Sequence, residues 1–503
     1  MAGPTSIPWP EICALAPVCT VVLVGLVVLL LDLVLKGDQR DMILPAAGHG
    51  LLLTALVSYL VRNQEAVRHA LAGAPGTAGG MDLDRFSLGL TMIACFASLL
   101  SLYLAPQYLR RRHIHEGPFA ALWVLAVAGM IVMTQAADLL ILLVGLEIMS
   151  MAFYILAGLD HGDARSPEAA LKYFLNGAFA SGVMIYGIVL VYGATGTIAF
   201  RPLASQILEL GTASGALPLL ARAGLALILG GFFFKVAAVP FHMWAPDVYE
   251  GAPTPVTAFL ATGVKVAAFA GLARMLYIGF PGYYEVWAPV LAGVAVITMI
   301  VGNLAAMVQE SLKRLLAFSS IAHAGYILVA VVSVDPRQLQ WEGAEALVFY
   351  LVTYTVATIG AFAMLAWTGR EQESLEQIVD YKGLARTHPW MALMMSVFLL
   401  ALAGLPPTAG FTGKYVVFAA AVKHGYWQLA VIGVLTSVLS AYYYLKVIVN
   451  MYFHEPDPEA PFVYTASPTV SATIWVCAIG VVYFGLCPTQ LLRLAHVAVS
   501  SLF

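Results

Sequence analysis

Long apolar runs recur along the whole of this 503-residue chain, and they constrain its fold more than any other feature. Hydrophobic residues make up 61% of the chain and charged residues only 11%. A helix needs about 20 apolar residues to cross the hydrocarbon of a bilayer, and about 14 runs are long enough. None of them alternates like a barrel strand, so the sequence predicts an all-α polytopic membrane protein with about 14 transmembrane helices.

The connections between these runs are short, so we expect any chemistry to occur within the membrane. The predicted spans cover residues 11–35, 42–61, 84–104, 118–135, 138–158, 168–193, 218–246, 254–276, 287–308, 312–333, 343–367, 389–422, 427–453 and 469–496.

Basic residues in the connections indicate the orientation of the chain. The odd-numbered connections carry more Lys and Arg than the even-numbered ones, which places them in the cytoplasm. With an even number of helices, both termini are then expected outside. The odd connections carry Lys36, Arg40, Arg110, Arg111, Arg112, Arg165, Lys313, Arg314, Arg370, Lys382 and Arg386, and the even ones carry Arg62, Arg68, Arg85, Arg201, Arg337 and Lys423.

Several classes of site are excluded by the sequence. The five cysteines form no C-x-x-C pair, so their spacing does not predict a metal or iron–sulfur site. No glycine-rich nucleotide motif is present. Net charge is −3, and the only basic tract is Arg110–Arg112, so nucleic acid is not an expected partner.

Lys235 and Lys414 each lie in a long apolar stretch where Gly and Pro interrupt the helix. The segment GGFFFKVAAVP surrounds Lys235, and AGLPPTAGFTGK ends at Lys414. A charge near the bilayer centre costs roughly 3 kcal/mol or more, so such a residue is expected to face the protein interior and to have partners. A broken helix beside a buried charge is typical of an ion path at mid-membrane.

Three further polar side chains lie near the centres of predicted spans. Glu147 cannot reach a membrane surface, and is either a structural, hydrogen-bonded carboxyl group or a group that exchanges protons. Lys265 is also far from either surface, and we interpret it as a relay lysine. His323 follows Ser319 and Ser320 on one helix face, and is either a satisfied interior histidine or a proton-transfer group.

Two lysines nearer the ends of spans leave alternatives open. Lys172 starts its span and could extend to the interface, but Asn176 at i+4 indicates a polar stripe running inward. Lys446 lies about two turns from the end of its span and is either a relay residue or an interfacial anchor. In order along the chain, Glu147, Lys235 and Lys265 occupy spans five, seven and eight, and His323, Lys414 and Lys446 repeat that spacing in spans ten, twelve and thirteen. This repetition is a weak indication of an internal repeat.

Five segments of the chain carry recognisable motifs. They are KVAAVPFHMWAPDVYEGAPTPVTAFLATGVKVAAF, SLKRLLAFSSIAHAGYILV, DYKGLARTHP, AGLPPTAGFTGK and YYYLKVIVNMYF. These segments closely resemble one family, the antiporter-like N subunits of proton-pumping NADH-quinone oxidoreductase, respiratory complex I. Related L and M subunits and cation/proton antiporter subunits share the H-x-W-x-P-D and A-P-T-P-V motifs, but typically have Asp-Ala-His where this chain has Asp247-Val248-Tyr249.

The resemblance implies roles for particular residues. Glu147 and Lys235 match the paired glutamate and lysine of a first half-channel, Lys265 the bridging lysine, and Lys414 the terminal lysine of a second half-channel. His323 falls where the family often carries a histidine. The resemblance also implies two inverted five-helix repeats, each with a broken helix. We therefore expect an N-terminal three-helix segment at 1–117, antiporter-like halves at 118–280 (helices 4–8) and 281–456 (helices 9–13), and a C-terminal helix at 457–503.

The expected function is that of a membrane-arm subunit of a redox-driven proton pump in a bacterial plasma (inner) membrane. The resemblance implies that NADH, FMN, iron–sulfur clusters and quinone belong to other subunits, and that M-like and K-like subunits and lipids are the neighbours in a hetero-oligomer. The alternatives are a subunit of a secondary cation/proton antiporter, against which the Asp247-Val248-Tyr249 segment argues, and a structural scaffold, in which buried lysines would have no use. The candidate proton-translocating residues are Glu147, Lys172, Lys235, Lys265, His323, Lys414 and Lys446.

Overall fold

The computed structural model describes residues 9–63, 80–212, 215–338, 340–368, 375–456 and 467–502. Within these ranges, 13 helices are long and apolar enough to cross a membrane, and the predicted all-helical architecture is confirmed. Arg68 and Arg370, which contributed to the predicted orientation, lie outside the described residues.

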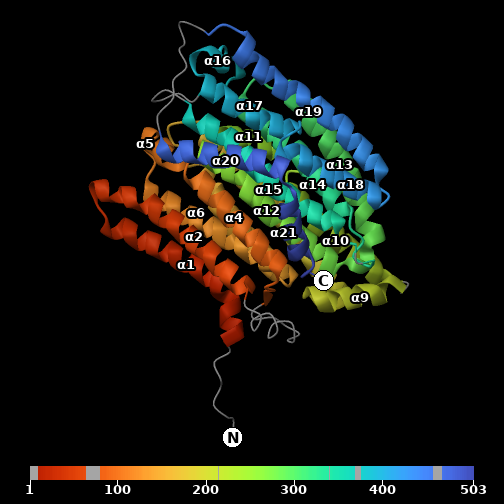
Figure 1. The fold of residues 1–503 in the computed structure, drawn as a ribbon. Coiled ribbons are helices and arrows are strands. Elements are labelled where there is room, and N and C mark those ends of the chain that lie inside the picture. Colours follow the sequence, from red (N-terminus) through yellow and green to blue (C-terminus); the bar gives the residue numbers. More distant parts are fainter. Residues whose placement is uncertain are drawn as a thin grey trace.

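The first helices form a layer at one side of the molecule, in red and orange in Figure 1, where α1, α2, α4 and α6 lie side by side. Helix α1 turns most of its surface outward, and only 17% of its 18-residue apolar stretch is buried. The bounds in this region are α1 (Trp9–Val34), α2 (Ile43–Asn63), α4 (Arg85–Leu102) and the short α5 (Ala105–Arg111).

The middle of the chain forms a bundle in which glycines allow close helix contacts. A Cβ atom on Gly187 of α8 would lie 2.6 Å from the carbonyl oxygen of Gly224 on α10, so these two helices touch through their backbones. The helices are α6 (Glu116–Gln135), α7 (Leu139–Ala157), α8 (Arg165–Thr195), α9 (Phe200–Thr212), α10 (Ala216–Lys235), α11 (Trp244–Gly251) and α12 (Thr254–Arg274).

The last part of the chain packs against α12. It comprises α13 (Tyr284–Met307), α14 (Leu312–Val332), α15 (Glu342–Trp367), α16 (Leu384–Thr387), α17 (Pro389–Ala403), α18 (Ala409–Lys423), α19 (Trp427–Phe453), α20 (Pro468–Leu486) and α21 (Thr489–Val499).

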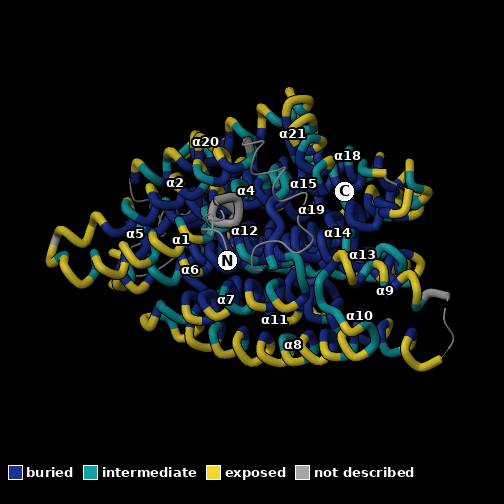
Figure 2. The backbone as a smooth tube through the Cα atoms, turned by 90° about the horizontal axis from the view of Figure 1, so that it is seen from below, coloured by how far each residue is buried: buried dark blue, intermediate teal, exposed yellow. Residues whose placement is uncertain are grey.

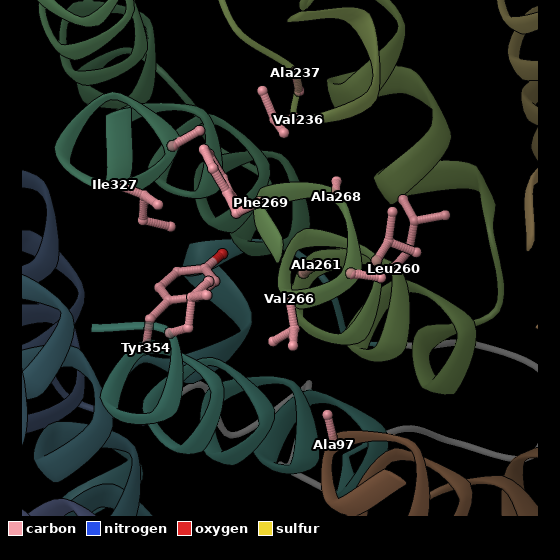
Figure 3. Close-up of a cluster of buried hydrophobic side chains, with 14 of the residues drawn as sticks. Ala97, Val236, Ala237, Leu260, Ala261, Val266, Ala268, Phe269, Ile327 and Tyr354 are labelled. Atoms are coloured by element: carbon pink, nitrogen blue, oxygen red, sulfur yellow. The ribbon is translucent and has the colours of Figure 1, made fainter. Parts of the chain in front are cut away.

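The core of the molecule is helix α12, which the other helices enclose. The 18-residue apolar stretch of the span that contains α12 is 100% buried, and the corresponding stretches of α14 and α15 are each 94% buried. Figure 3 shows Phe269 and Val266 of α12 among Ile327 of α14, Tyr354 of α15 and Val236 from the segment after α10. By contrast, α8 is exposed along one edge of the molecule in Figure 2.

The seventh predicted span is interrupted directly after Lys235. Helix α10 ends there, and the chain runs irregularly until α11 begins at Trp244. Ala237 takes a left-handed conformation with a φ of 57°, which ends the regular helical hydrogen bonding. The carbonyl oxygen of Phe234 accepts from the Ala237 backbone N–H and from the Trp244 indole, each at 3.0 Å. The break predicted at Lys235 is confirmed.

The twelfth predicted span, 389–422, consists of two helices. Helices α17 and α18 have 15 residues each, which is about 22 Å of helix and too short to cross a bilayer alone. Gly404 ends α17 with a φ of 83°, and a Cβ atom on it would lie 2.7 Å from Cδ of Lys414. Glycine is therefore required at this position, and the break predicted before Lys414 is confirmed.

Candidate functional site

Lys235 is buried at the junction of three helices. Its side chain is at the end of α10, where the residue is 2% exposed. The ammonium group donates to Ser150 Oγ of α7 at 2.8 Å and to the Tyr173 hydroxyl of α8 at 3.0 Å. The Tyr173 ring stacks on Trp244 of α11 at 4.4 Å, so the helix after the break holds one of the two acceptors in place.

Glu147 lies on α7, one turn before Ser150. Its carboxylate accepts a hydrogen bond from Ser181 of α8. A cavity with room for about one water molecule is lined by Ser181, Ser150 and Lys235. Glu147 is also close enough to Lys235 for the two to interact electrostatically. The structure thus brings these two predicted site residues together, with two serine hydroxyl groups between them.

Lys172 belongs to a different cluster. Its ammonium group pairs with Glu168 at 2.7 Å and with Asp247 of α11 at 2.8 Å, and its side chain is 43% exposed. Asn176, the next member of the predicted polar stripe, donates to the backbone carbonyl of Lys172 at 2.7 Å. Lys172 therefore holds α8 against α11, and among the described residues its ammonium group does not contact Lys235.

Lys265 lies at the centre of α12 and is 1% exposed. Its ammonium group donates to the backbone carbonyl of Ser320 on α14 and lies 5.5 Å from the centre of the Tyr354 ring. The Tyr354 hydroxyl donates to Ser320 Oγ at 2.8 Å. Lys265 therefore connects α12 with both α14 and α15 through Ser320.

His323 lies one turn after Ser320 on α14. Its Nδ1 is 2.7 Å from the Tyr350 hydroxyl of α15. Its Nε2 is buried and has no hydrogen-bond partner within the part of the chain that the structure describes. His323 is close enough to both Lys265 and Lys414 to interact with them electrostatically. The histidine is therefore within electrostatic reach of both lysines, and its ring also lies close to the Leu402 backbone.

Lys414 lies beside the second break. Its ammonium group donates to the carbonyl oxygens of Leu402 at 3.1 Å and Ala403 at 2.8 Å, which end α17, and to Ser437 Oγ of α19 at 2.8 Å. Carbonyls at a helix C-terminus have no helical partner and carry partial negative charge, so they stabilise an ammonium group. The ring centre of Tyr326 on α14 is 5.0 Å away.

Lys446 is not brought to this row of residues. Its side chain lies on the exposed face of α19, and no contact of its ammonium group occurs among the described residues. Both alternatives for Lys446, relay residue and interfacial anchor, therefore stay open.

A chain of tyrosines and one asparagine connects the second half of the row, and sequence reasoning missed it. Asn303 Nδ2 donates to the Tyr326 hydroxyl at 3.2 Å, and the Tyr443 hydroxyl donates to Asn303 Oδ1 at 3.0 Å. The rings of Tyr443 and Tyr444 are 4.4 Å apart, and the Tyr444 hydroxyl bonds to Ser319. A polar residue inside an apolar helix, such as Asn303 in α13, was the available signal.

The three buried lysines share one electrostatic property. Within the described ranges, Lys235, Lys265 and Lys414 form no ion pair, and their acceptors are hydroxyl and carbonyl oxygens. When a buried ammonium group has no carboxylate partner, its hydrogen bonds to neutral acceptors replace only part of the hydration free energy that it loses on burial. Such groups take up or release a proton when a neighbouring charge changes.

An ion-pair cluster holds α11 at its position after the break. Asp247 accepts from Lys172 at 2.8 Å and from Arg314 of α14 at 2.9 Å, and Arg314 also donates to Glu250 at 2.9 Å. Burial raises the pKa of the Asp247 carboxyl, but the hydrogen bonds from Lys172 and Arg314 outweigh this effect, and the pKa is lowered from its usual value.

No group of three or more His, Cys, Asp or Glu side chains within the described residues could hold a metal ion.

The sequence is similar to several known proteins. Residues 136–440 match the family described as NADH:quinone oxidoreductase/Mrp antiporter, transmembrane. An NADH-quinone oxidoreductase subunit N of Trichlorobacter lovleyi is 43% identical over 417 residues, which are 83% of this chain and 84% of that one. A subunit N of Chloroflexus aggregans is 40% identical over 494 residues, 98% of each chain.

Solved structures with a similar fold include a chain of respiratory complex I from Thermus thermophilus with bound aureothin. It has a TM-score of 0.77 and 35% identity, covering 95% of this chain and 98% of that one. A chain of the Mrp complex from Dietzia has a TM-score of 0.78 over 99% of this chain and 98% of that one, but only 22% identity, so it shows the fold alone.

Proposed function

Since the chain belongs to the subunit N family of NADH-quinone oxidoreductase, the proton-translocating membrane-arm subunit of respiratory complex I, we propose that it moves protons along the row of buried residues described above. The observation that carries this proposal is the state of the three buried lysines, which contact neutral acceptors alone. The residues of the row are Glu147, Lys235, Lys265, His323 and Lys414.

The first step passes between Glu147 and Lys235. Ser181 donates to Glu147, Ser150 accepts from Lys235, and both serines line the cavity with room for one water molecule. Hydroxyl groups and water both donate and accept, so they can pass a proton between an acid and a base that are not in direct contact. When Glu147 is ionised its charge stabilises the protonated lysine, and when it is neutral the lysine releases its proton.

The second step passes from Lys265 toward Lys414. Ser320 contacts Lys265, and its helix α14 carries His323, whose ring interacts electrostatically with both lysines. Nε2 of His323 lies close to the Leu402 backbone and has the chemistry to exchange a proton, and Nδ1 is tied to the Tyr350 hydroxyl. Lysine suits this role because it titrates when it is desolvated, whereas arginine stays protonated.

Lys172 and Lys446 are proposed to act at the ends of the row. Lys172 is half exposed within the ion-pair cluster on α11, where it would act as a fixed positive charge near the first half of the path. Lys446 is exposed on α19, where a neighbouring subunit would supply its partner. We expect smaller contributions from these two than from the fully buried lysines, because exposed charges are screened by solvent.

We also propose the setting of the chain. Its neighbours are M-like and K-like membrane-arm subunits and lipids, and NADH, FMN, iron–sulfur clusters and quinone are bound by other subunits of the complex. The membrane is the bacterial plasma (inner) membrane, with both termini on the periplasmic side. The N-terminal segment spans 1–117, the two antiporter-like halves span 118–280 and 281–456, and the C-terminal helix falls in 457–503.

The deciding experiment replaces Lys265 in the whole complex. Lys265→Ala is expected to abolish NADH-driven proton uptake into inverted membrane vesicles, while the complex still assembles. Lys36→Ala, which removes an exposed lysine between the first two helices, is the matched control and is expected to pump normally. Normal pumping by an assembled Lys265→Ala complex would refute the proposed path.

A cation/proton antiporter subunit is the second candidate. The similarity to the Mrp chain extends to the fold only, and Asp247-Val248-Tyr249 departs from the antiporter pattern. Purification of the chain with NADH dehydrogenase subunits would decide for complex I, and purification without them would favour the antiporter.

A further inference from the structure

An apolar groove of about 520 Å³ lies between α4, α15, α20 and α21. Its outward-facing side chains include Phe96, Ile479 and Leu494, which are 44%, 63% and 54% exposed. Along α4 the groove runs from Phe86 to Phe96, which is about 15 Å of helix and so about half the thickness of the hydrocarbon core. The groove thus has the length of one leaflet of the bilayer.

Two arginines lie at one end of this groove. Arg62, the last basic residue of α2, lines it, and Arg85 begins α4 directly before Phe86. Both side chains are partly buried, and they are close enough to repel one another electrostatically. Like charges held together in this way are destabilising unless an anion lies between them.

No anion of the described part of the chain fills that place. Neither Arg62 nor Arg85 forms an ion pair there. The nearest carboxylates in sequence, Asp82 and Asp84, pair with the buried Arg274 at 3.3 Å and 2.5 Å. With respect to the described residues, the two arginines therefore carry excess positive charge at the mouth of an apolar groove.

We propose that this groove binds one anionic phospholipid, with its phosphate between Arg62 and Arg85 and an acyl chain along α4. Arginine binds phosphate through paired N–H groups, and the apolar walls bury the hydrocarbon. The length of the groove and the charge at its end both match one lipid of a single leaflet. The inference needs only the fold and its place in a membrane, so it is independent of the proton path.

The test uses the purified whole complex and a phosphatidylglycerol that carries a photoactivatable acyl chain. We expect the probe to label peptides of α4 or α20, with competition by phosphatidylglycerol but not by phosphatidylcholine of the same chain length. Arg62→Gln combined with Arg85→Gln is expected to lower labelling roughly tenfold or more, from two lost phosphate contacts. Arg493→Gln is the control, because Arg493 is exposed on α21 and does not line the groove.

A second variant tests the groove without changing its charge. A Cβ atom on Gly89 would meet only Ala498, at an ordinary 3.8 Å, so Gly89→Leu adds a side chain to the groove without a backbone clash. We expect Gly89→Leu to reduce labelling in a complex that assembles and pumps normally. If the double arginine variant does not assemble, Arg62→Gln alone and Gly89→Leu carry the test.

Three outcomes would overturn the proposal: equal labelling by a phosphatidylcholine probe, labelling unchanged in Arg62→Gln and Gly89→Leu, or cross-linking of the groove to another subunit in place of lipid.

Discussion

Lys235 donates a hydrogen bond to Ser150 at 2.8 Å, and this contact places the end of α10 one turn along α7 from Glu147. Lys235 therefore bonds to a hydroxyl group, and it forms no ion pair with Glu147. The arrangement keeps the acid and the base within electrostatic reach but separate, so each can change its charge without the other being locked in a salt bridge.

Ser150→Ala is expected to slow proton pumping roughly tenfold. The substitution leaves one N–H group of Lys235 without an acceptor, and such a loss costs about 1–3 kcal/mol in a buried site. The measurement is proton uptake by inverted vesicles driven by NADH, normalised to assembled complex. Ser58→Ala, which removes another fully buried serine on α2, is the control and should pump normally. Equal rates for the two variants would show that Ser150 plays no part in the path.

Lys235→Arg is expected to impair pumping nearly as much as Lys235→Ala, although the positive charge is kept. Arginine stays protonated under these conditions and cannot release a proton when Glu147 becomes neutral. Proton translocation in membranes of both variants is the measurement, and Lys36→Arg serves as the control. Full activity of Lys235→Arg would mean that the site needs only a fixed charge.

Glu147→Gln is expected to reduce pumping sharply while the complex still assembles. Glutamine keeps the hydrogen bond from Ser181 but cannot change its charge. Ser181→Ala is expected to have a smaller effect, because Glu147 keeps its charge. Subunit composition on native gels controls for assembly, and normal pumping with a normal assembly profile would rule out a proton-carrying role for Glu147.

Lys414→Ala is expected to reduce pumping more than Lys446→Ala. Lys414 makes three hydrogen bonds beside the second break, whereas Lys446 lies exposed on α19. The two variants are compared in the same vesicle assay at equal amounts of complex. A larger loss for Lys446→Ala would place the main path at the surface of α19 instead of the interior.

Asp247→Asn is expected to lower the Tm of the complex by a few degrees, because α11 loses its ion pairs with Lys172 and Arg314. The effect is limited by the partial exposure of these groups. The pKa of Asp247 is lowered in the folded protein, so its stabilisation is present above the unfolded pKa of about 3.9 and is lost as pH falls through the folded value.

The difference in Tm between Asp247→Asn and the unchanged protein should therefore be constant near neutral pH and shrink below about pH 4. Glu168→Gln is the control, because Glu168 shares the partner Lys172 but is 61% exposed. A difference in Tm that does not vary with pH would show that the carboxylate charge is not what holds α11.

The sequence alone predicted the features that leave a local signal. Lysines inside apolar runs marked Lys235 and Lys414, and neighbouring Gly and Pro marked both breaks, because each of these residues is costly in an unbroken membrane helix. The predicted span 389–422 still needed the structure to show that α17 and α18 are separate helices of 15 residues.

Contacts between distant helices were not predictable from the sequence. Lys172 pairs with Asp247, which is 75 residues away, and nothing near Lys172 indicates that partner. Helices α12 and α14 are buried around almost their whole circumference, so the sequence does not show which face meets which neighbour. The bond from Lys265 to the Ser320 carbonyl and the position of Asn303 between Tyr326 and Tyr443 depend on that packing.

The complete enclosure of α12 has a consequence for how the membrane is sealed. Because the other helices surround the span that contains Lys265, lipid tails do not reach it, and the chain itself supplies the electrical insulation around that charge. A change of lipid or detergent acts first on outward-facing helices such as α1 and α8, whose apolar stretches are 17% and 33% buried. A proton leak across the centre of the molecule would therefore require one of the helices packed on α12, such as α4 or α15, to separate from it, and not merely a thinner or more fluid bilayer.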